Sequence, residues 1–193
     1  MMSPQQNRQN RRDPRGRRPE TAPEEKQFDE RTIHIDRVAR VVKGGRRFRF
    51  RALVVLGDHK GRVGMGMAKG ADVTSAVTKA TEIAKKSLIE VPLYKGTLPH
   101  DVEVKLGGTH LVIKPASAGT GLIAGGVVRT ILEVAGVHNA LSKSLGSTNR
   151  TNTAYATLEA LQRLVPANKW VTRTTATPAA KAPREKAAAV EEA

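Results

Sequence analysis

The chain has 193 residues, and its 33 lysines and arginines against 18 acidic residues give a net charge of +15. It contains no cysteine, which excludes disulfides, thiolate zinc sites and cysteine nucleophiles and fits a reducing cytoplasm. No stretch approaches the roughly 18 to 20 unbroken apolar residues of a membrane span. A charge of this size predicts a polyanionic partner, either nucleic acid or an acidic membrane surface.

The composition at both ends of the chain predicts disorder. Residues 1–27 are rich in Gln, Asn, Arg and Pro, so they cannot bury enough apolar surface to offset the entropy of ordering. Residues 173–193, dominated by Thr, Ala, Pro, Lys and Glu, are expected to be a second disordered tail. The arginines of the N-terminal arm either settle onto phosphates or only aid solubility. They are Arg8, Arg11, Arg12, Arg15, Arg17 and Arg18.

The first ordered segment, residues 28–93, is predicted to be a small antiparallel sheet with one helix. Apolar and polar residues alternate on either side of the Gly44–Gly45 pair, and two glycines can take the positive φ angles of a tight hairpin turn. A third strand is expected after Gly61. Apolar residues then recur at helical spacing over 73–88, and we expect Pro92 to end this helix.

Residues 94–172 form a second predicted unit, which starts with a hairpin over 102–113 around a diglycine turn. A glycine-rich stretch at 119–126 opens a helix, and a further strand is expected at 140–145. The last helix is expected to start among residues 147–152. Its apolar stripe would contain Ala154, Leu158, Leu161 and Val165. The predicted fold class is therefore α+β, with two small domains that each place a layer of helix on a layer of sheet.

The segment VVKGGRRFRFRALVV, residues 41–55, carries the strongest local signal. Alternate side chains of a strand point to opposite faces, so one face is predicted to be cationic and to contain Arg47, Arg49 and Arg51. Lys43 and Arg46 flank the diglycine turn and bring positive charge to a narrow tip that could enter an RNA groove. The ordinary alternative is a solvated hairpin. Cations this close together repel each other, however, unless an anion lies opposite.

Two aromatic residues on the other face of this strand, Phe48 and Phe50, are assigned to the core. Aromatic side chains spaced by two also occur where a sheet stacks RNA bases. The whole chain has only three Phe, two Tyr and one Trp, and a surface that stacks successive bases needs several exposed rings. Recognition of the RNA backbone and shape is therefore the favoured prediction.

Two glycine-rich segments resemble nucleotide-binding motifs. Gly64, Gly66 and Gly70 precede a helix, but they do not follow the long apolar strand as a dinucleotide fingerprint would, so no cofactor is expected there. The second segment precedes the N-terminus of another helix, where free N–H groups favour an anion. It is predicted either to hold an RNA phosphate or to allow close approach of a neighbouring protein. Its glycines are Gly119, Gly121, Gly125 and Gly126.

Residue patterns typical of enzymes are not found. The histidines are scattered without metal-ligand spacing, and no pair of carboxylates offers a site for general acid–base chemistry. We therefore expect no catalytic residue, no metal and no cofactor. The histidines are His34, His59, His100, His110 and His138.

Three longer segments carry a specific likeness. VVKGGRRFRFRALVVLGD, GRVGMGMAKG and KPASAGTGLIAGGVVRTILEVAGVHNALSKSLGSTN closely resemble the bacterial ribosomal protein S-five family of the small subunit. The resemblance covers roughly residues 28–165 in the right order and with the right gaps, and it extends to neither tail. The sequence departs from the usual pattern at Met65, where Phe or Leu is common, and at Arg150, where Pro often stands.

The resemblance implies a fold and a function. The family has a first half similar to a double-stranded RNA-binding domain and a second α+β half. Its members are structural proteins on small-subunit rRNA near the decoding region and near where mRNA enters. The family's hairpin, which matches Lys43, Gly44, Gly45 and Arg46 here, reaches into the rRNA near a spectinomycin site.

The resemblance also implies protein partners and further RNA contacts. Family members touch the ribosomal proteins S-four and S-eight, and the S-four contact, which bears on decoding accuracy, matches Gly121 with Arg129. The family also helps to unwind structured mRNA, so Arg49, Arg62 and Lys69 are expected to face RNA. Two alternatives remain at this point: a nucleotide-dependent enzyme that uses residues 119–129 as a phosphate cradle, and a free-standing binder of double-stranded RNA.

Overall fold

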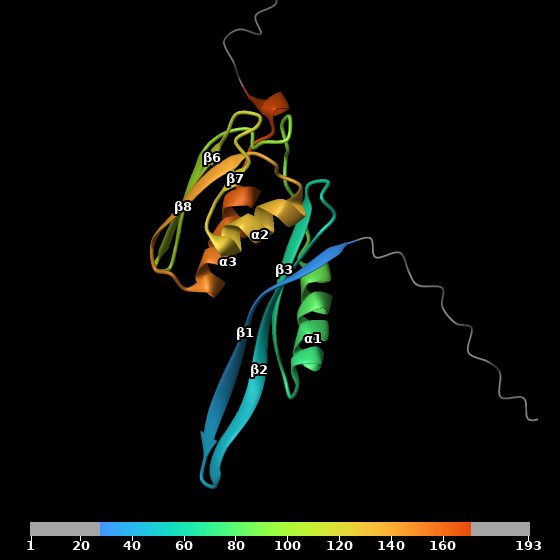
Figure 1. Cartoon of the computed structure of the whole chain (residues 1–193), viewed down its shortest axis with the longest axis vertical. Coiled ribbons are helices and arrows are strands. Elements are labelled where there is room, and N and C mark those ends of the chain that lie inside the picture. Colours follow the sequence, from blue (N-terminus) through green and yellow to red (C-terminus); the bar gives the residue numbers. More distant parts are fainter. Residues whose placement is uncertain (1–27, 171–193) are drawn as a thin grey trace, which may run out of the picture.

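The computed structural model describes residues 28–170, so the predicted arm at 1–27 and the tail at 173–193 lie outside the described residues. The described part contains two four-stranded sheets, and at least one helix packs on each of them (Figure 1). The predicted α+β class, with a sheet-plus-helix unit in each half, is confirmed.

The N-terminal sheet is antiparallel and follows chain order. Its strands are β1 (Asp29–Val42), β2 (Gly45–Gly57), β3 (Arg62–Gly70) and β4 (Ile89–Glu90). Helix α1 (Val73–Lys86) packs on β2 and β3. The hairpin of β1 and β2 is longer than the rest of this unit and projects away from it (Figure 1). The predicted strands, hairpin and helix are all present.

Helix α1 ends earlier than predicted. We expected Pro92 to end it, but the last helical residue is Lys86. The chain then turns back, and the two residues of β4 pair with the start of β3, Ile89 opposite Val63. The prediction was wrong because a two-residue strand carries no readable alternation, and the pairing of that strand requires the helix to stop before it.

Glycines of β3 allow α1 to pack closely on the sheet. A Cβ atom added to Gly66 would lie 1.9 Å from the carbonyl oxygen of Ala80, and one added to Gly64 would lie 2.4 Å from that of Ala84. The facing helix surface is made of small buried residues, Ala76, Ala80 and Ala84. Contact of backbone with backbone therefore accounts for the glycine spacing that resembles a dinucleotide motif.

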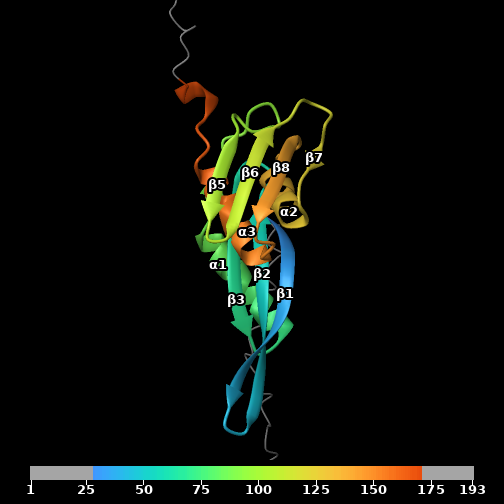
Figure 2. The ribbon, with the colours of Figure 1, turned by 90° about the vertical axis from the view of Figure 1, so that its left-hand side faces the viewer.

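The C-terminal sheet has the order β5-β6-β8-β7 (Figure 2). Its strands are β5 (Val102–Leu106), β6 (Thr109–Pro115), β7 (Leu122–Ile123) and β8 (Ala140–Gly146). Helices α2 (Gly126–Ala135) and α3 (Arg150–Gln162) contact each other and this half of the molecule. Strand β7, which pairs parallel with β8, was not predicted. Asn149 caps α3, as the expected start required, but Val165 lies beyond the end of the helix and is exposed, so its placement on the apolar stripe of this helix was wrong.

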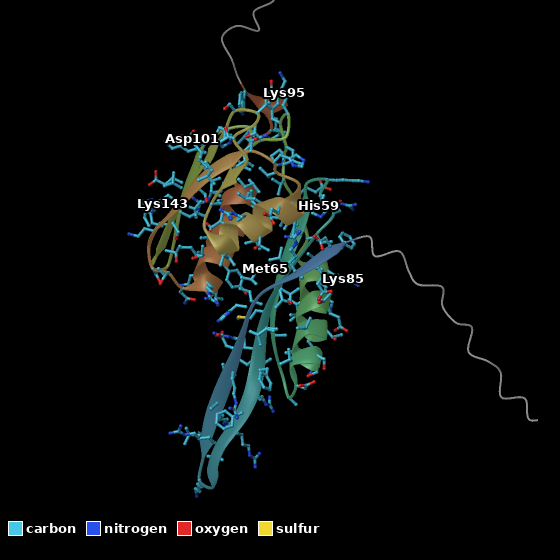
Figure 3. All side chains as sticks on the ribbon, in the orientation of Figure 1. His59, Met65, Lys85, Lys95, Asp101 and Lys143 are labelled. Atoms are coloured by element: carbon cyan, nitrogen blue, oxygen red, sulfur yellow. The ribbon has the colours of Figure 1, made fainter. Side chains whose placement is uncertain are left out.

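The two halves share one hydrophobic core. Leu53, Val55 and Met65 of the N-terminal sheet belong to the same buried cluster as Ile131 of α2 and Leu161 of α3. Met65 lies where the two halves meet (Figure 3). Strand β2 is thus covered on one face by α1 and on the other by the C-terminal half, which explains why its residues from 52 to 56 are all buried.

Hydrogen bonds also join the halves. Two backbone N–H groups of the turn between β2 and β3 donate hydrogen bonds to the last carbonyls of α2. His59 N donates to Val134 O over 3.1 Å, and Gly61 N donates to Ala135 O over 3.0 Å. These carbonyls have no partner within their own helix. Gly136, which ends α2 at a φ of +89°, passes so close to His59 that an added Cβ would lie 2.2 Å from its carbonyl oxygen. The turn therefore fixes where α2 sits against the N-terminal sheet.

Candidate nucleic-acid interface

The tip of the β1–β2 hairpin is exposed from Lys43 to Arg49. Val42 pairs with Gly45, so the two residues of the turn are Lys43 and Gly44 rather than the glycine pair itself. Only Gly45 of the pair has a positive φ, +138°. The predicted turn is present, shifted by one residue, and it leaves the Lys43 and Arg46 side chains on either side of an open tip.

The register of β1, β2 and β3 gathers five cations on one face of the sheet. Residues directly opposite each other on paired strands point to the same face. Arg40 lies opposite Arg47, and Lys69 of β3 lies opposite Arg51. We call this set the basic face: Arg40, Arg47, Arg49, Arg51 and Lys69. Arg40 was missed in the sequence because its place on this face depends on which residue of β2 it meets.

The outer part of the basic face has no carboxylate to balance it. Within residues 28–170, no ion pair involves Arg40, Arg47 or Arg49. Like charges directly opposite each other on paired strands are destabilising. The Arg40–Arg47 pair therefore favours an anion, and a chain of phosphates could neutralise several of these side chains at once.

Arg51 differs from the other arginines of the basic face. Its Nε and Nη2 atoms donate to Oδ2 of Asp36, over 3.1 and 2.5 Å. The hydrogen bond from Arg51 lowers the pKa of Asp36 against the effect of burial, and a hydrogen bond from His34 contributes in the same direction as Arg51. Because the guanidinium of Arg51 is already held by a carboxylate, it is less free to meet a phosphate than Arg49.

The other face of the hairpin is not a continuous core. Phe50 packs against the buried residues Ala52 and Val54, as predicted. Phe48 is 47% exposed, so its assignment to the core was wrong. The guanidinium carbon of Arg37 lies 3.8 Å from the centre of the Phe48 ring. The error has a simple cause: alternation shows which face a side chain occupies, but not how far the covering helix extends along that face.

Arg62 does not join the basic face. It lies at the start of β3, at the opposite end of that strand from Lys69. Its Nε donates to Oδ2 of Asp58 over 2.8 Å. Burial raises the pKa of Asp58, but hydrogen bonds from Lys60 N, the Arg62 side chain and Arg62 N outweigh it, so the pKa lies below its ordinary value. The Arg62 side chain thus stabilises the turn between β2 and β3.

The glycine loop before α2 is open. Gly119 and Gly121 have φ angles of +91° and +73°, and a Cβ added to either, or to Gly125, would meet nothing within 4 Å. The Gly121 N–H donates to Oδ1 of Asn139 over 3.0 Å. Arg129 is exposed on the first turns of α2 and borders a hollow that Arg31 also lines. Packing within residues 28–170 therefore leaves the surface of this loop free for a phosphate or a neighbouring protein.

Among residues 28–170, no three His, Asp or Glu side chains are grouped so that they could hold a metal ion. None of the described helices is long and apolar enough to cross a membrane.

Two family models match the chain. One, described as ribosomal protein S5, N-terminal domain, covers residues 28–92 and so includes the hairpin. The other, described as ribosomal protein S5, C-terminal domain, covers residues 104–172 and includes the glycine loop.

The chain is also similar to curated proteins that are called small ribosomal subunit protein uS5. It is 55% identical to the one from Thermus thermophilus over 140 residues, which are 72% of this chain and 86% of the relative. For Syntrophobacter fumaroxidans the identity is 54% over 138 residues, 72% and 83% of the two chains. For Treponema pallidum it is 51% over 145 residues, 75% and 84%. The two matched models and these identities show that the chain belongs to the ribosomal protein S5 family.

Proposed function

We propose that the protein is a structural component of the small ribosomal subunit and that it binds rRNA through the β1–β2 hairpin. The observation that carries the proposal is the like-charge pair Arg40 and Arg47 on a hairpin that projects from the fold (Figure 2). An rRNA phosphate placed between them would turn a repulsion into two charge-assisted contacts. The family to which the chain belongs and its net charge of +15 both support this assignment.

The mechanism is neutralisation of phosphates by a preformed surface. Lys43 and Arg46 at the tip, with Arg47 and Arg49 behind them, follow the RNA backbone. Contacts of this kind position a protein without reading bases. The shared core and the hydrogen bonds from the turn at His59 hold the rest of the protein at a set angle to the hairpin. The rRNA therefore meets one rigid body rather than two independent domains.

The finer parts of the proposal concern neighbours in the particle. The glycine loop, with Gly119, Gly121 and Gly125, and Arg129 after it contact the ribosomal protein S-four, and this contact supports decoding accuracy. S-eight is a second protein neighbour. Arg62 and Lys69 lie toward RNA, including mRNA where it enters the subunit. The open surface at these glycines supports a close approach by a partner. The protein acts in the cytoplasm, in the ribosome, without enzymatic activity.

The test is co-sedimentation of the full chain with ribosomal particles across a salt series. The triple variant Lys43→Ala, Arg46→Ala and Arg47→Ala is compared with a charge-matched control, Lys105→Ala, Lys114→Ala and Lys143→Ala. The control lysines lie on the C-terminal sheet, well away from the hairpin; Lys143 is labelled in Figure 3. The hairpin variant is expected to be stripped from small subunits at lower salt than the wild type.

Each lost phosphate contact reduces the magnitude of the slope of log affinity against log salt by about 0.7 to 0.9. The slope of the hairpin variant, which lacks three cations, should therefore be smaller in magnitude by about 2 to 3. If both triple variants leave the small subunit at the same salt concentration, only net charge matters, and the proposal that the hairpin is the RNA-binding element is wrong. A wild type that stays at the top of the gradient at low salt would refute assembly into the small subunit. If the protein binds any RNA duplex as tightly as it binds rRNA, the alternative of a free-standing RNA binder is favoured instead.

A further inference from the structure

An exposed aromatic side chain lies on the hairpin where neither the sheet nor α1 covers it. Phe50 pairs with Gly70, the last residue of β3, and α1 starts just after that strand. Phe48 is two residues further toward the tip, so its face of the hairpin has no neighbouring element. It is 47% exposed. The fold thus places an aromatic residue on an otherwise strongly cationic projection and leaves it half-exposed.

Arg37 already lies against this ring. It pairs with Phe50, and from there its guanidinium reaches diagonally over Phe48, with Cζ 3.8 Å from the ring centre. At this distance the contact is a cation–π interaction. A planar guanidinium can stack on an aromatic ring with one side and on a nucleobase with the other. Arg37 is itself exposed, so a second planar group can reach it.

Apart from Arg46, the residues around this pair are small or apolar. Ala39 lies opposite Phe48 and is exposed, and Val41, opposite Arg46, is 75% exposed. We call Arg37, Ala39, Val41 and Phe48 the aromatic face. It is the reverse of the basic face, because alternate residues of each strand point to opposite sides. One hairpin therefore has a side suited to phosphates and a side suited to a flat, weakly polar group.

We infer that the aromatic face binds an unpaired nucleobase of RNA, stacked on the Arg37–Phe48 pair. The inference rests on the proposed function, since the hairpin must be on RNA for the base to reach it. An unpaired nucleotide combines a π surface with a phosphate, and Arg46 on the same face of the hairpin offers a cation for that phosphate. A base inside a duplex is already stacked on both sides and cannot make this contact. The hairpin thus favours RNA with a bulged or looped-out nucleotide over a continuous duplex.

The test uses the full chain and two RNA hairpins that differ by one bulged 2-aminopurine, whose fluorescence falls when it stacks. Wild-type protein is expected to bind the bulged RNA about 5- to 10-fold more tightly than the continuous one and to quench the fluorophore, in line with the strength of base–aromatic stacking. Phe48→Leu keeps an apolar side chain and the charge, and should lose both the preference and the quenching while binding the continuous RNA as before.

Two further variants separate stacking from charge. Arg37→Lys keeps the positive charge but replaces the planar guanidinium, on which a base can stack, with an ammonium group, so it should also reduce quenching. Arg40→Lys makes the same change on the basic face and should leave the preference within about twofold of wild type. An unchanged preference in Phe48→Leu, or a wild type that binds both RNAs equally and quenches neither, would overturn the inference and leave the proposed function standing. A wild type that binds neither RNA nor small subunits would instead defeat the proposed function.

Discussion

Arg150, the first residue of α3, donates a hydrogen bond from Nη1 to Nδ1 of His34 on β1, over 2.5 Å. A guanidinium can only donate, so Nδ1 accepts and the ring proton lies on Nε2. Nε2 then faces Oδ1 of Asp36 over 2.5 Å, and the other oxygen of Asp36 holds Arg51. A chain of four side chains thus runs from the C-terminal half to the base of the basic face.

Replacement of Arg150 tests this chain of contacts. Arg150→Pro should keep α3 intact, because Pro is favoured at the first helical position and Asn149 is already extended, with φ −62° and ψ 113°. The contact with His34 is lost, and since both side chains are partly exposed the cost should stay within about 1 kcal/mol. The ¹⁵N shift of His34 Nδ1 should change in Arg150→Pro and Arg150→Ala alike. An unaltered shift in both would contradict the hydrogen bond.

The arginines of the basic face should not contribute equally to RNA binding. Arg49→Ala should lower the slope of log affinity against log salt by about 0.7 to 0.9, whereas Arg51→Ala should lower it less, because Asp36 already holds that guanidinium. Asp36→Asn should release Arg51 for RNA and so make the salt dependence steeper than that of the wild type. Filter binding to rRNA at four salt concentrations measures these slopes. Equal slopes for the two alanine variants would contradict the ranking.

Close packing of α1 on β3 should make Gly66 intolerant of any side chain. The Cβ of Gly66→Ala would lie 1.9 Å from the backbone oxygen of Ala80, so the helix must shift, at a cost of about 3 kcal/mol. Gly44→Ala is the matched control, since an added Cβ there meets nothing within 4 Å, and its effect should stay within about 0.5 kcal/mol. Urea denaturation of both variants checks this. Similar free energies of unfolding would show that the helix is not held so closely.

Asp58 should make stability depend on pH. Its pKa is lowered in the folded protein, so the ionised carboxylate stabilises the fold above its ordinary pKa of 3.8, and this contribution is lost as the pH falls through the lower folded value. Asp58→Asn should therefore cost about 1 to 2 kcal/mol at pH 7, and the gap from wild type should narrow from about pH 4 downward. Urea denaturation at pH 7 and pH 3 measures it. A gap that stays constant would contradict the assignment.

Much of the fold can be predicted from local pattern. The alternation of β1 and β2, the helical spacing of α1 and the hairpin of β5 and β6 are repeated over many residues, and each repeat reinforces the others. The short strands β4 and β7 were missed because two residues carry no period. Their pairing partners, at Val63 and Ala140, decide that they are strands.

Some features of the candidate site could likewise be predicted from the sequence, and others depend on the tertiary structure. The amino-acid sequence by itself determined the positive charge, the cationic alternation at Arg47, Arg49 and Arg51, and the family. Only the tertiary structure decided that Arg40 joins the basic face, that Asp36 restrains Arg51 and that Phe48 is open. Charge and alternation are properties of residues and their nearest neighbours. Exposure and pairing depend on where α1 and the C-terminal half end relative to the hairpin, and those ends are set by contacts between residues far apart in the chain.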